Sequence, residues 1–307
     1  KMHQITVRAA FDQFLASGKR KLITRSKYAY KLRPFLEEHG QLPIGQITQR
    51  HALNWFEAME ASDLAEATLA MTRSCLVAFL NFCVRSGWLA SNPAQVVPRY
   101  DGRPKRVVTA NPDHVAQALT LCGILAKTSD ATARRDAAIF ALAAISGGRR
   151  SNIMLMPFRE TVTALHYPEA DPAVGNIYTV ATRGKTPIEI VFGEFHAGIL
   201  RGWLEVRPES ESNRLFVHLR PSSLGKPLEA NGLGHARKNI CKITGVPVIT
   251  FQAMRKLRGT QIARQFNLEL AASALGHISG TKVIREHYYD PDKHAAHVAI
   301  LQTGRSR

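Results

Sequence analysis

The sequence predicts a mainly α-helical fold with a small β-sheet (α+β), divided into two domains. At 307 residues the chain is too long for most single compact domains and suits two. Its first third repeats apolar residues at helical spacing, whereas β-rich stretches occur only in the second half. We therefore expect a helical domain at 1–93, a linker at 94–110 and a mixed domain at 111–307.

Residues 5–93 are expected to be entirely helical. Three apolar stripes with helical spacing run through them, and a further helix is expected from about Gln49 to Met59. The third stripe is followed by Gly87 and then Pro93, which stop a helix. These features predict a bundle of about four or five helices. The stripes comprise Val7, Phe11, Phe14 and Leu15, then Tyr28, Leu32, Phe35 and Leu36, and finally Leu69, Leu76, Phe79, Leu80 and Cys83.

The segment 94–110 contains Pro98, Gly102 and Pro104, shows no apolar periodicity and carries several basic residues. This composition is typical of an extended linker between domains. Two interpretations stay open for it: a linker alone, or a linker whose positive charge also contacts a polyanion.

The remaining residues, 111–307, are expected to mix helices and strands. The last two of three β-rich stretches are joined by Arg183-Gly184-Lys185, which suits a hairpin turn. The β-rich stretches are Met154–His166, Asn176–Thr182 and Thr186–Phe192. Helices are expected near 112–126, 132–146, 193–206, 231–244, 251–266, 268–275, 281–289 and 293–301.

The charge of the chain indicates the class of its partner. There are 41 Lys and Arg against 24 Asp and Glu, a formal net charge of +17. Such an excess favours a polyanion, and nucleic acid comes first among these. A membrane surface also attracts cations, but no apolar run approaches the roughly 18 to 20 residues that span a bilayer. We expect double-stranded DNA as the partner and no membrane.

The four cysteines, Cys75, Cys83, Cys122 and Cys241, are scattered, and no CxxC pair occurs. No His/Cys cluster has the spacing of zinc ligands. We therefore expect a reducing, cytoplasmic environment and neither metal nor cofactor.

Five residues that could carry chemistry on DNA follow one another as Arg149, Lys185, Arg255, His277 and Tyr288. Exchanging DNA strands without a high-energy cofactor needs a side-chain nucleophile that conserves the phosphodiester energy in a covalent link. It also needs cations that hold the non-bridging oxygens, and a proton donor for the departing sugar hydroxyl. This set of residues supplies each of these.

The segments around these residues resemble the tyrosine site-specific recombinases and phage integrases. Residues 146–152 (SGGRRSN) resemble the Thr-Gly-x-Arg-x-Ser-Glu box of that family, and 250–255 (TFQAMR) resemble its His-x-x-Arg box. Residues 275–277 match its Leu-Gly-His, and Tyr288-Tyr289 follow where its nucleophile is expected. The resemblance implies a SAM-like core-binding domain followed by a tyrosine-recombinase catalytic domain.

The resemblance assigns the two arginines to the scissile phosphate. Arg149 follows an apolar helix and two glycines, and a guanidinium there can hold a phosphate through two hydrogen bonds. Its neighbour Arg150 could take this place if the box were aligned one residue later. The alignment of positions 146, 147 and 151 with the family's box selects Arg149. Arg255 is the expected second clamp; a solvated basic helix face with Lys256, Arg258 and Arg264 is the competing interpretation.

By the same resemblance, Lys185 is the general acid for the 5′-oxygen leaving group, with Arg183 as its competitor. His277 would hydrogen-bond the scissile phosphate. Tyr288 lies eleven residues after His277 and Tyr289 twelve, where the family spacing is about nine. We choose Tyr288 as the nucleophile because the first of a doubled aromatic usually reacts in the family, and Tyr289 stays the alternative.

Two positions depart from the family pattern. Gln252 stands where the family has His or Lys, and an amide cannot exchange a proton near neutral pH. This predicts slower chemistry or activation of the tyrosine by another group, for which His287 is one candidate. Asn152 replaces the usual Glu, which keeps hydrogen bonding and loses a carboxylate.

The sequence therefore predicts a recombinase or integrase that works through a 3′-phosphotyrosine and a Holliday junction. The resemblance implies a homotetramer on DNA with specific recombination sites, monomeric when free, in a bacterial or phage-derived setting. Two alternatives stay open: a DNA-binding protein with weakened catalysis on the same scaffold, and a type IB topoisomerase-like relaxing enzyme. An additional N-terminal arm-binding domain, which many integrases carry, is not visible in these residues.

Overall fold

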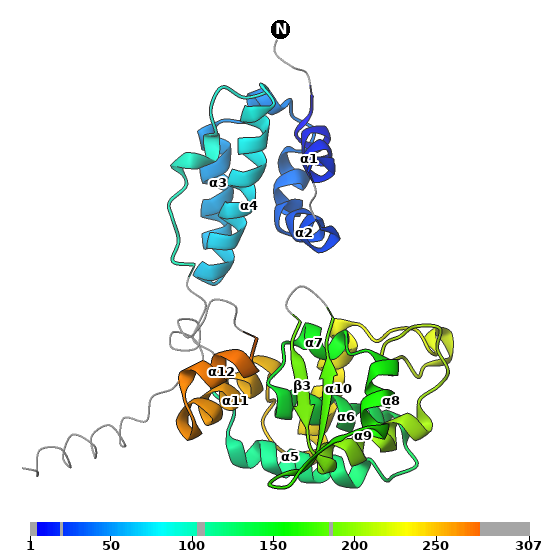
Figure 1. Ribbon diagram of the computed structural model, residues 1–307. Coiled ribbons are helices and arrows are strands. Elements are labelled where there is room, and N and C mark those ends of the chain that lie inside the picture. The colour runs from blue at the N-terminus through cyan, green and yellow to red at the C-terminus, as the bar shows by residue number, and fades with distance from the viewer. Residues whose placement is uncertain (1–4, 19–20, 103–107, 184–186, 277–307) are drawn as a thin grey trace, which may run out of the picture. The chain divides into compact units, whose positions relative to one another are not determined.

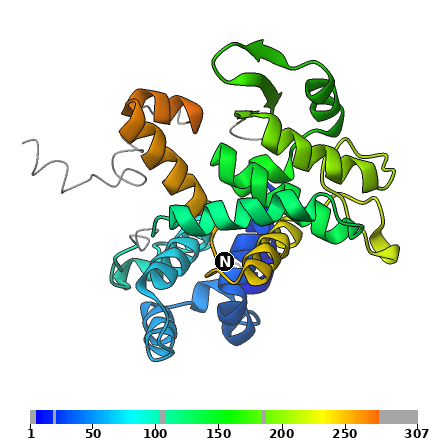
Figure 2. The same ribbon diagram turned by 90° about the horizontal axis from the view of Figure 1, so that it is seen from below.

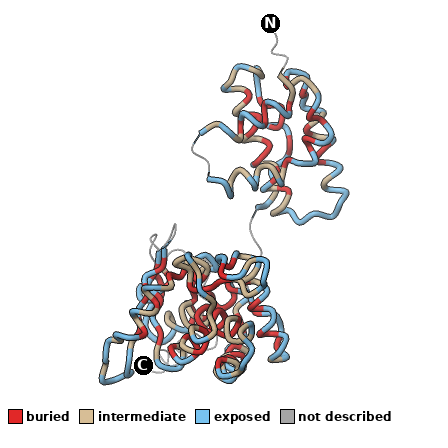
Figure 3. The backbone as a smooth tube through the Cα atoms, turned by 90° about the vertical axis from the view of Figure 1, so that its right-hand side faces the viewer, coloured by how far each residue is buried: buried red, intermediate tan, exposed pale blue. Residues whose placement is uncertain are grey.

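The computed structural model describes residues 5–18, 21–102, 108–183 and 187–276. The chain divides into two compact units, Lys1–Lys105 and Arg106–Arg307, and buried residues gather in the centre of each (Figure 3). The fold is mostly helical with a three-stranded sheet, which confirms the predicted class. The helices expected near 281–289 and 293–301 lie outside the described residues.

The first unit is a helical bundle around an aromatic core. The ring centroid of Phe14 lies 5.6 Å from that of Phe79 and 4.9 Å from that of Tyr28, so the three apolar stripes of the sequence meet. Its helices are α1 (Val7–Ala16), α2 (Leu22–His39), α3 (Gln49–Glu60) and α4 (Glu66–Arg85), with 3-10 turns η1 (Ile44–Gln46) and η2 (Pro93–Val96) (Figure 1).

Helix α4 is long and apolar enough to cross a membrane by length and composition alone. Its residues Leu76, Phe79 and Leu80 are fully buried inside the unit, however, which is the pattern of a core helix. Gly87 follows the helix with φ at +72°, and the Asn92 side chain caps η2.

Part of the segment expected as linker packs on the first unit. Ala94 and Val97 are buried in its core, and Arg73 Nε donates to the Val97 carbonyl at 2.9 Å. The Tyr100 hydroxyl donates to the Glu60 carboxylate at 2.7 Å. The chain is therefore fixed on the bundle as far as Tyr100.

The second unit is built around helix α6 (Ala131–Ser146), whose residues 136–143 are all buried. Four of these eight residues are alanine, and their small side chains allow close approach of the helices packed around α6. Those helices are α5 (Pro112–Leu125), α9 (Glu194–Val206), α10 (Ala230–Thr244) and α11 (Phe251–Gln265). Figures 1 and 2 show α12 (Leu268–Ala274) beside α11.

The sheet is an antiparallel meander of β1 (Glu169–Asp171), β2 (Gly175–Ala181) and β3 (Glu189–Phe192). Tyr178 pairs with Phe192 across β2 and β3, and their rings stack with centroids 5.5 Å apart on the buried face. The pairing of the two strands around the predicted hairpin is thus confirmed, while its tip, residues 184–186, lies outside the described residues.

The β-rich interpretation of Met154–His166 was wrong, because this stretch is helical. It contains the end of α7 (Arg150–Met154) and the whole of α8 (Phe158–His166). Threonine and valine suggested a strand. Thr161 and Leu165, four residues apart, are instead the buried positions of an amphipathic helix that packs against β2. Tertiary burial therefore overrides local propensity here.

Candidate active site

Arg149 stands at a sharp junction between two helices. Helix α6 ends at Gly147, which has φ at +55°, and α7 begins at Arg150 with Arg149 as its N-cap. The Ser146 hydroxyl fixes the turn, accepting from the Gly148 N–H at 3.0 Å and donating to the Leu142 carbonyl at 2.6 Å. Arg149 is half-buried in this turn and Arg150 is exposed.

Gly147 is needed here for space as well as for its backbone angle. A Cβ atom at this position would lie 2.9 Å from Leu275 Cδ2 and 3.1 Å from Arg258 Cβ. Real Cβ atoms do not approach a side chain at 2.9 Å, so the junction, α11 and the end of α12 meet at a glycine.

Arg255 holds the same three segments together. Its side chain is completely buried, with Nη1 donating to the Gly147 carbonyl at 2.9 Å and Nη2 to the Leu275 carbonyl at 2.7 Å. The guanidinium is thus solvated by backbone oxygens of both neighbouring motifs. The three sequence motifs, far apart along the chain, are joined through one side chain.

The turn after α12 also contacts the hairpin. Gly276 has φ at +63°, and a Cβ atom there would lie 2.3 Å from Ile188 Cγ2. Gly148 approaches the same isoleucine, since its Cβ would be 3.4 Å from Ile188 Cδ1. The backbone that leads directly into His277 is therefore packed against the base of the hairpin that carries Lys185.

Two side-chain interactions anchor that hairpin base. On the buried side, Asn152 Nδ2 donates to Thr182 Oγ1 at 3.2 Å. On the exposed side, Arg183 Nη2 donates to the Glu160 carboxylate at 2.6 Å. Asn213 and Arg183 both donate to Glu160, Asn213 with the larger effect, and together they hold the pKa of this carboxyl below its ordinary value. Arg183, the rival of Lys185, is therefore engaged in an ion pair.

Gln252 lies in the first turn of α11 and is exposed, whereas Arg255 one turn later is buried. Thr250 caps the helix, its hydroxyl accepting from the Ala253 N–H at 3.0 Å. The interpretation of α11 as a solvated basic face does not hold for Lys256, which is 2% exposed.

Arg258 on α11 was not picked out by the sequence as part of the site. Burial lowers the pKa of its guanidinium. Burial and the positive charge of Arg258 together lower the pKa of His196, on α9, to about 4. The sequence signal was the spacing of three from Arg255, but spacing alone does not distinguish a buried cation from a surface one.

The remaining predicted site residues, Lys185, His277, Tyr288 and Tyr289, and the suggested substitute His287, lie outside the described residues. Within the part of the chain that the structure describes, no group of three or more His, Cys, Asp or Glu side chains could hold a metal ion.

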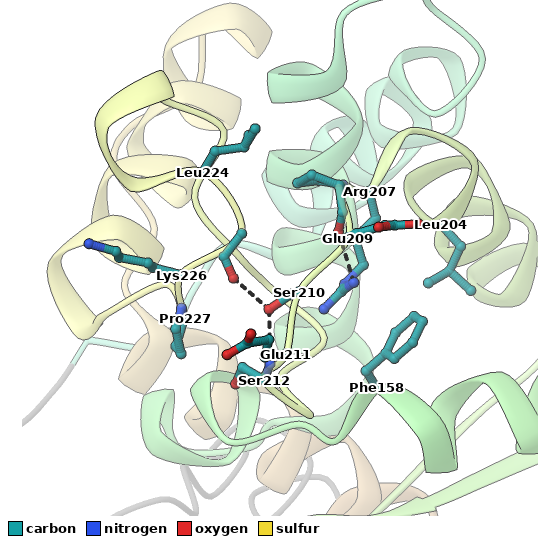
Figure 4. A pocket seen from close by; sticks show the side chains of 12 residues that line it. Phe158, Leu204, Arg207, Glu209, Ser210, Glu211, Ser212, Leu224, Lys226 and Pro227 are labelled. Atoms are coloured by element: carbon teal, nitrogen blue, oxygen red, sulfur yellow. Dashed lines mark hydrogen bonds between the residues drawn. The ribbon is translucent and has the colours of Figure 1, made fainter.

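A separate cavity of about 800 Å³ opens between the loops 207–212 and 224–227 (Figure 4). The Arg207 guanidinium lies 4.1 Å from the ring centroid of Phe158 and donates to the Leu215 and Arg214 carbonyls. Neither Arg149 nor Arg255 lines this cavity, so it is not part of the candidate active site.

The structure thus combines a helical bundle with a second unit that brings together two arginine motifs, a Leu-Gly turn and the base of a hairpin. The family described as "Phage integrase, N-terminal SAM-like domain" matches residues 9–87. The tyrosine recombinase XerC of Mycobacterium sp. (strain JLS) is 26% identical over 278 residues, covering 87% of this chain and 89% of the relative. XerC of Mycobacterium tuberculosis (strain ATCC 25177 / H37Ra) is 26% identical over 63% of each chain.

Solved structures show the same fold. A lambda integrase dimer bound to a COC′ core site superposes with a TM-score of 0.66 at 17% identity, covering 93% of this chain and 95% of the other. The Tn1549 transposon integrase in complex with a circular intermediate DNA gives a TM-score of 0.67 at 18% identity, with 97% and 99% covered. The chain is thus similar to tyrosine recombinases over most of its length, and its residues 9–87 match the N-terminal SAM-like domain of phage integrases.

Proposed function

We propose that this chain is a site-specific recombinase that cuts and rejoins double-stranded DNA through a tyrosine. The observation that carries the proposal is the position of Arg255, whose guanidinium joins the Arg149 motif to the turn before His277. This arrangement supports a single phosphate site formed by motifs that lie apart in the sequence. The similarity to tyrosine recombinases and the net charge of +17 support DNA as the substrate.

In the proposed reaction, Tyr288 attacks the scissile phosphate and forms a 3′-phosphotyrosine, with Tyr289 as the alternative nucleophile. Lys185 protonates the departing 5′-oxygen. Arg149, Arg255 and His277 stabilise the charge that develops on the non-bridging oxygens. The 5′-hydroxyl of a partner strand then attacks the phosphotyrosine and restores the backbone, so no external energy source is needed.

Exposed lysines on α10 support binding along duplex DNA by the second unit. Lys238 and Lys242 are exposed and lie four residues apart, and therefore on one face of the helix. Lysines that contact phosphates release counterions, so such binding depends strongly on salt. We propose that this face contacts the DNA backbone.

The assembly is proposed from its relatives. A lambda integrase tetramer bound to a Holliday junction has the same fold, with a TM-score of 0.66. We propose that four copies of this chain act together on two recombination sites and that the free chain is a monomer. The proposed setting is the cytoplasm of a bacterium, since the XerC relatives come from mycobacteria.

A trapping experiment tests the function. The full chain is incubated with a library of random-sequence duplexes that each carry a nick, so that cleavage beside the nick releases a short strand and traps the covalent adduct. We expect an adduct that resists denaturation, that Tyr288→Phe abolishes and that Tyr289→Phe leaves intact. The reverse pattern would move the nucleophile to Tyr289, and no adduct from the unmodified chain would contradict the proposed function.

One observation favours a second candidate, a DNA-binding protein with weakened catalysis. Gln252 is exposed at the position where the family has a residue able to exchange a proton. The same library separates the two candidates, because tight and selective binding without an adduct at any pH is expected of the second alone.

A further inference from the structure

We propose that Asn152 is a positioning residue that orients Arg149 toward the scissile phosphate by linking its backbone to the base of the β2–β3 hairpin. The inference rests on the proposed function, because it concerns the part that Arg149 plays in that reaction. It assigns a role to the asparagine that stands where the family has a glutamate.

The side chain of Asn152 bridges two elements. Its Oδ1 accepts from the Arg149 N–H at 3.0 Å, and its Nδ2 donates to Thr182 Oγ1 at 3.2 Å. Asn152 is 2% exposed and Thr182 is 3% exposed. At this burial water has little access to either side chain, so breaking the bridge costs buried hydrogen bonds.

The orientation of the amide follows from its partners. A backbone N–H can only donate, so the atom of Asn152 that faces Arg149 is the oxygen. Thr182 Oγ1 donates its single proton to the Ile188 carbonyl at 2.9 Å and accepts from the Ile188 N–H at 2.9 Å. Its contact with Asn152 must therefore be a second acceptance, which requires an N–H donor.

This donor requirement explains the departure from the family pattern. An ionised carboxylate has no proton to donate. With an acid at position 152, Thr182 would have to turn its proton away from Ile188, or face a carboxylate oxygen with its own lone pairs. An amide satisfies Arg149 and Thr182 together. Asparagine is thus matched to Thr182 and is not merely a weakened glutamate.

The bridge adds a second support to the turn that Arg255 contacts. Gly147, two residues before Arg149, is fixed by the hydrogen bond of its carbonyl to Arg255. Asn152 fixes the N–H of Arg149 itself and, through Thr182, ties it to Ile188, which packs on Gly148. The turn from Gly147 to Arg149 is therefore held by both α11 and the base of the hairpin.

The test compares two variants with a matched control. Asn152→Asp keeps the acceptor for the Arg149 N–H and removes the donor to Thr182, and Thr182→Val removes the acceptor while keeping the shape. The control is Thr161→Val, which also loses a buried hydroxyl, one that donates to the Pro157 carbonyl and touches neither Asn152 nor Arg149.

The readout is the rate of adduct formation on two nicked duplexes that differ at the scissile phosphate. One carries an ordinary phosphodiester, and the other carries a methylphosphonate, in which a methyl group replaces one charged oxygen and reduces the need for a guanidinium. Arg149→Ala, which lacks the guanidinium altogether, is the reference variant for both substrates. We expect both variants to slow cleavage of the phosphodiester by about 10- to 100-fold, since small misplacements of a reacting group cost this much.

On the methylphosphonate, we expect the defect of both variants to shrink to within about threefold of the unmodified chain, as the reference variant should also show. Thr182→Ser, which retains the hydroxyl, should restore the phosphodiester rate and keeps the test valid if Thr182→Val does not fold. Thr161→Val should affect both substrates equally.

Equal slowing on both substrates by Asn152→Asp, or no slowing at all, would overturn the role of Asn152. That result differs from a failure of the proposed function, in which the unmodified chain forms no adduct with either duplex.

Discussion

Arg255 donates to the carbonyl oxygen of Gly147, a residue 108 positions earlier in the chain, at 2.9 Å. The contact places a fully buried cation against a backbone oxygen at the junction of α6 and α7. Because the same guanidinium also donates to Leu275, removing it breaks two buried links. The residue that the family assigns to phosphate thus also has a structural role in this chain.

Arg255→Met is expected to lower the free energy of unfolding by about 3 kcal/mol, because two buried carbonyl oxygens lose their donors. The measurement is urea unfolding followed by far-ultraviolet circular dichroism. Arg264→Met, on the exposed face of the same helix, should change stability by less than about 0.5 kcal/mol. Equal effects of the two substitutions would show that the hydrogen bonds of Arg255 contribute little to the free energy of unfolding.

Gly147→Ala should destabilise the second unit by about 2 to 4 kcal/mol. The added Cβ meets Leu275 and Arg258 and also forces alanine into the left-handed region. Gly245→Ala isolates the backbone cost, because Gly245 has φ at +77° with nothing within 4 Å of its Cβ position. It should cost about 1 kcal/mol in the same thermal or urea unfolding measurement. If Gly245→Ala lowers the free energy of unfolding as much as Gly147→Ala, the whole effect comes from the backbone conformation and not from the contacts of the added Cβ.

Gln252→His is expected to speed adduct formation by about 10- to 100-fold, because imidazole can exchange a proton near neutral pH. The rate should then change with pH around 6.5, the ordinary pKa of histidine, whereas the unmodified chain lacks this step. Gln261→His, exposed on the same helix, is the matched control. An unchanged rate in single-turnover trapping would mean that another group already performs the proton transfer.

Replacing Lys238 and Lys242 by glutamine should weaken DNA binding and reduce the dependence of log Kd on log salt by about one for each lysine that contacts phosphate. The loss should be similar for all duplex sequences, since phosphate contacts do not read bases. Fluorescence anisotropy at several salt concentrations measures both quantities. Lys226→Gln, at an exposed loop position, is the comparison, and an equal loss there would argue against a specific DNA face on α10.

His196 predicts a dependence of stability on pH. Its pKa in the folded chain is about 4, below the ordinary 6.5, because burial and then Arg258 disfavour the imidazolium. Between these values the unfolded chain binds the proton more readily, so stability rises with pH and is lost as pH falls from about 6.5 toward 4. The unmodified chain should lose about 2 kcal/mol more than His196→Gln over this range in urea unfolding. Parallel pH profiles would contradict a half-buried His196 that stays neutral in the folded chain.

The helices of the first unit and most of those in the second could be predicted from apolar spacing, because buried faces repeat at the helical period. α8 was predicted wrongly, since the threonines and valine of 161–163 favour strands locally and only the packing of Thr161 and Leu165 decides for a helix. The short strand β1 was missed because three residues, two of them acidic, carry no strand pattern.

Some features of the candidate site could likewise be predicted from the sequence, and others could not. Arg149 and Arg255 could be proposed from motifs, since their residue types and spacing are local. The burial of Arg255 and the bridge from Asn152 to Thr182 could not, because each joins residues that are far apart in the sequence. The sequence showed that Asn152 departs from the family pattern, and only the contacts show what its amide group does.

The burial of α6 has a consequence for how the protein is made. Residues 136–143 are enclosed partly by α10 and α11, which the ribosome adds about a hundred residues later. Until those helices have been synthesised, α6 is only partly buried, and the carbonyl of Gly147 lacks its hydrogen-bond donor Arg255. The packing around α6 can therefore be completed only after α10 and α11 have been synthesised. A chaperone that shields α6 on the nascent chain is expected to raise the yield of folded protein.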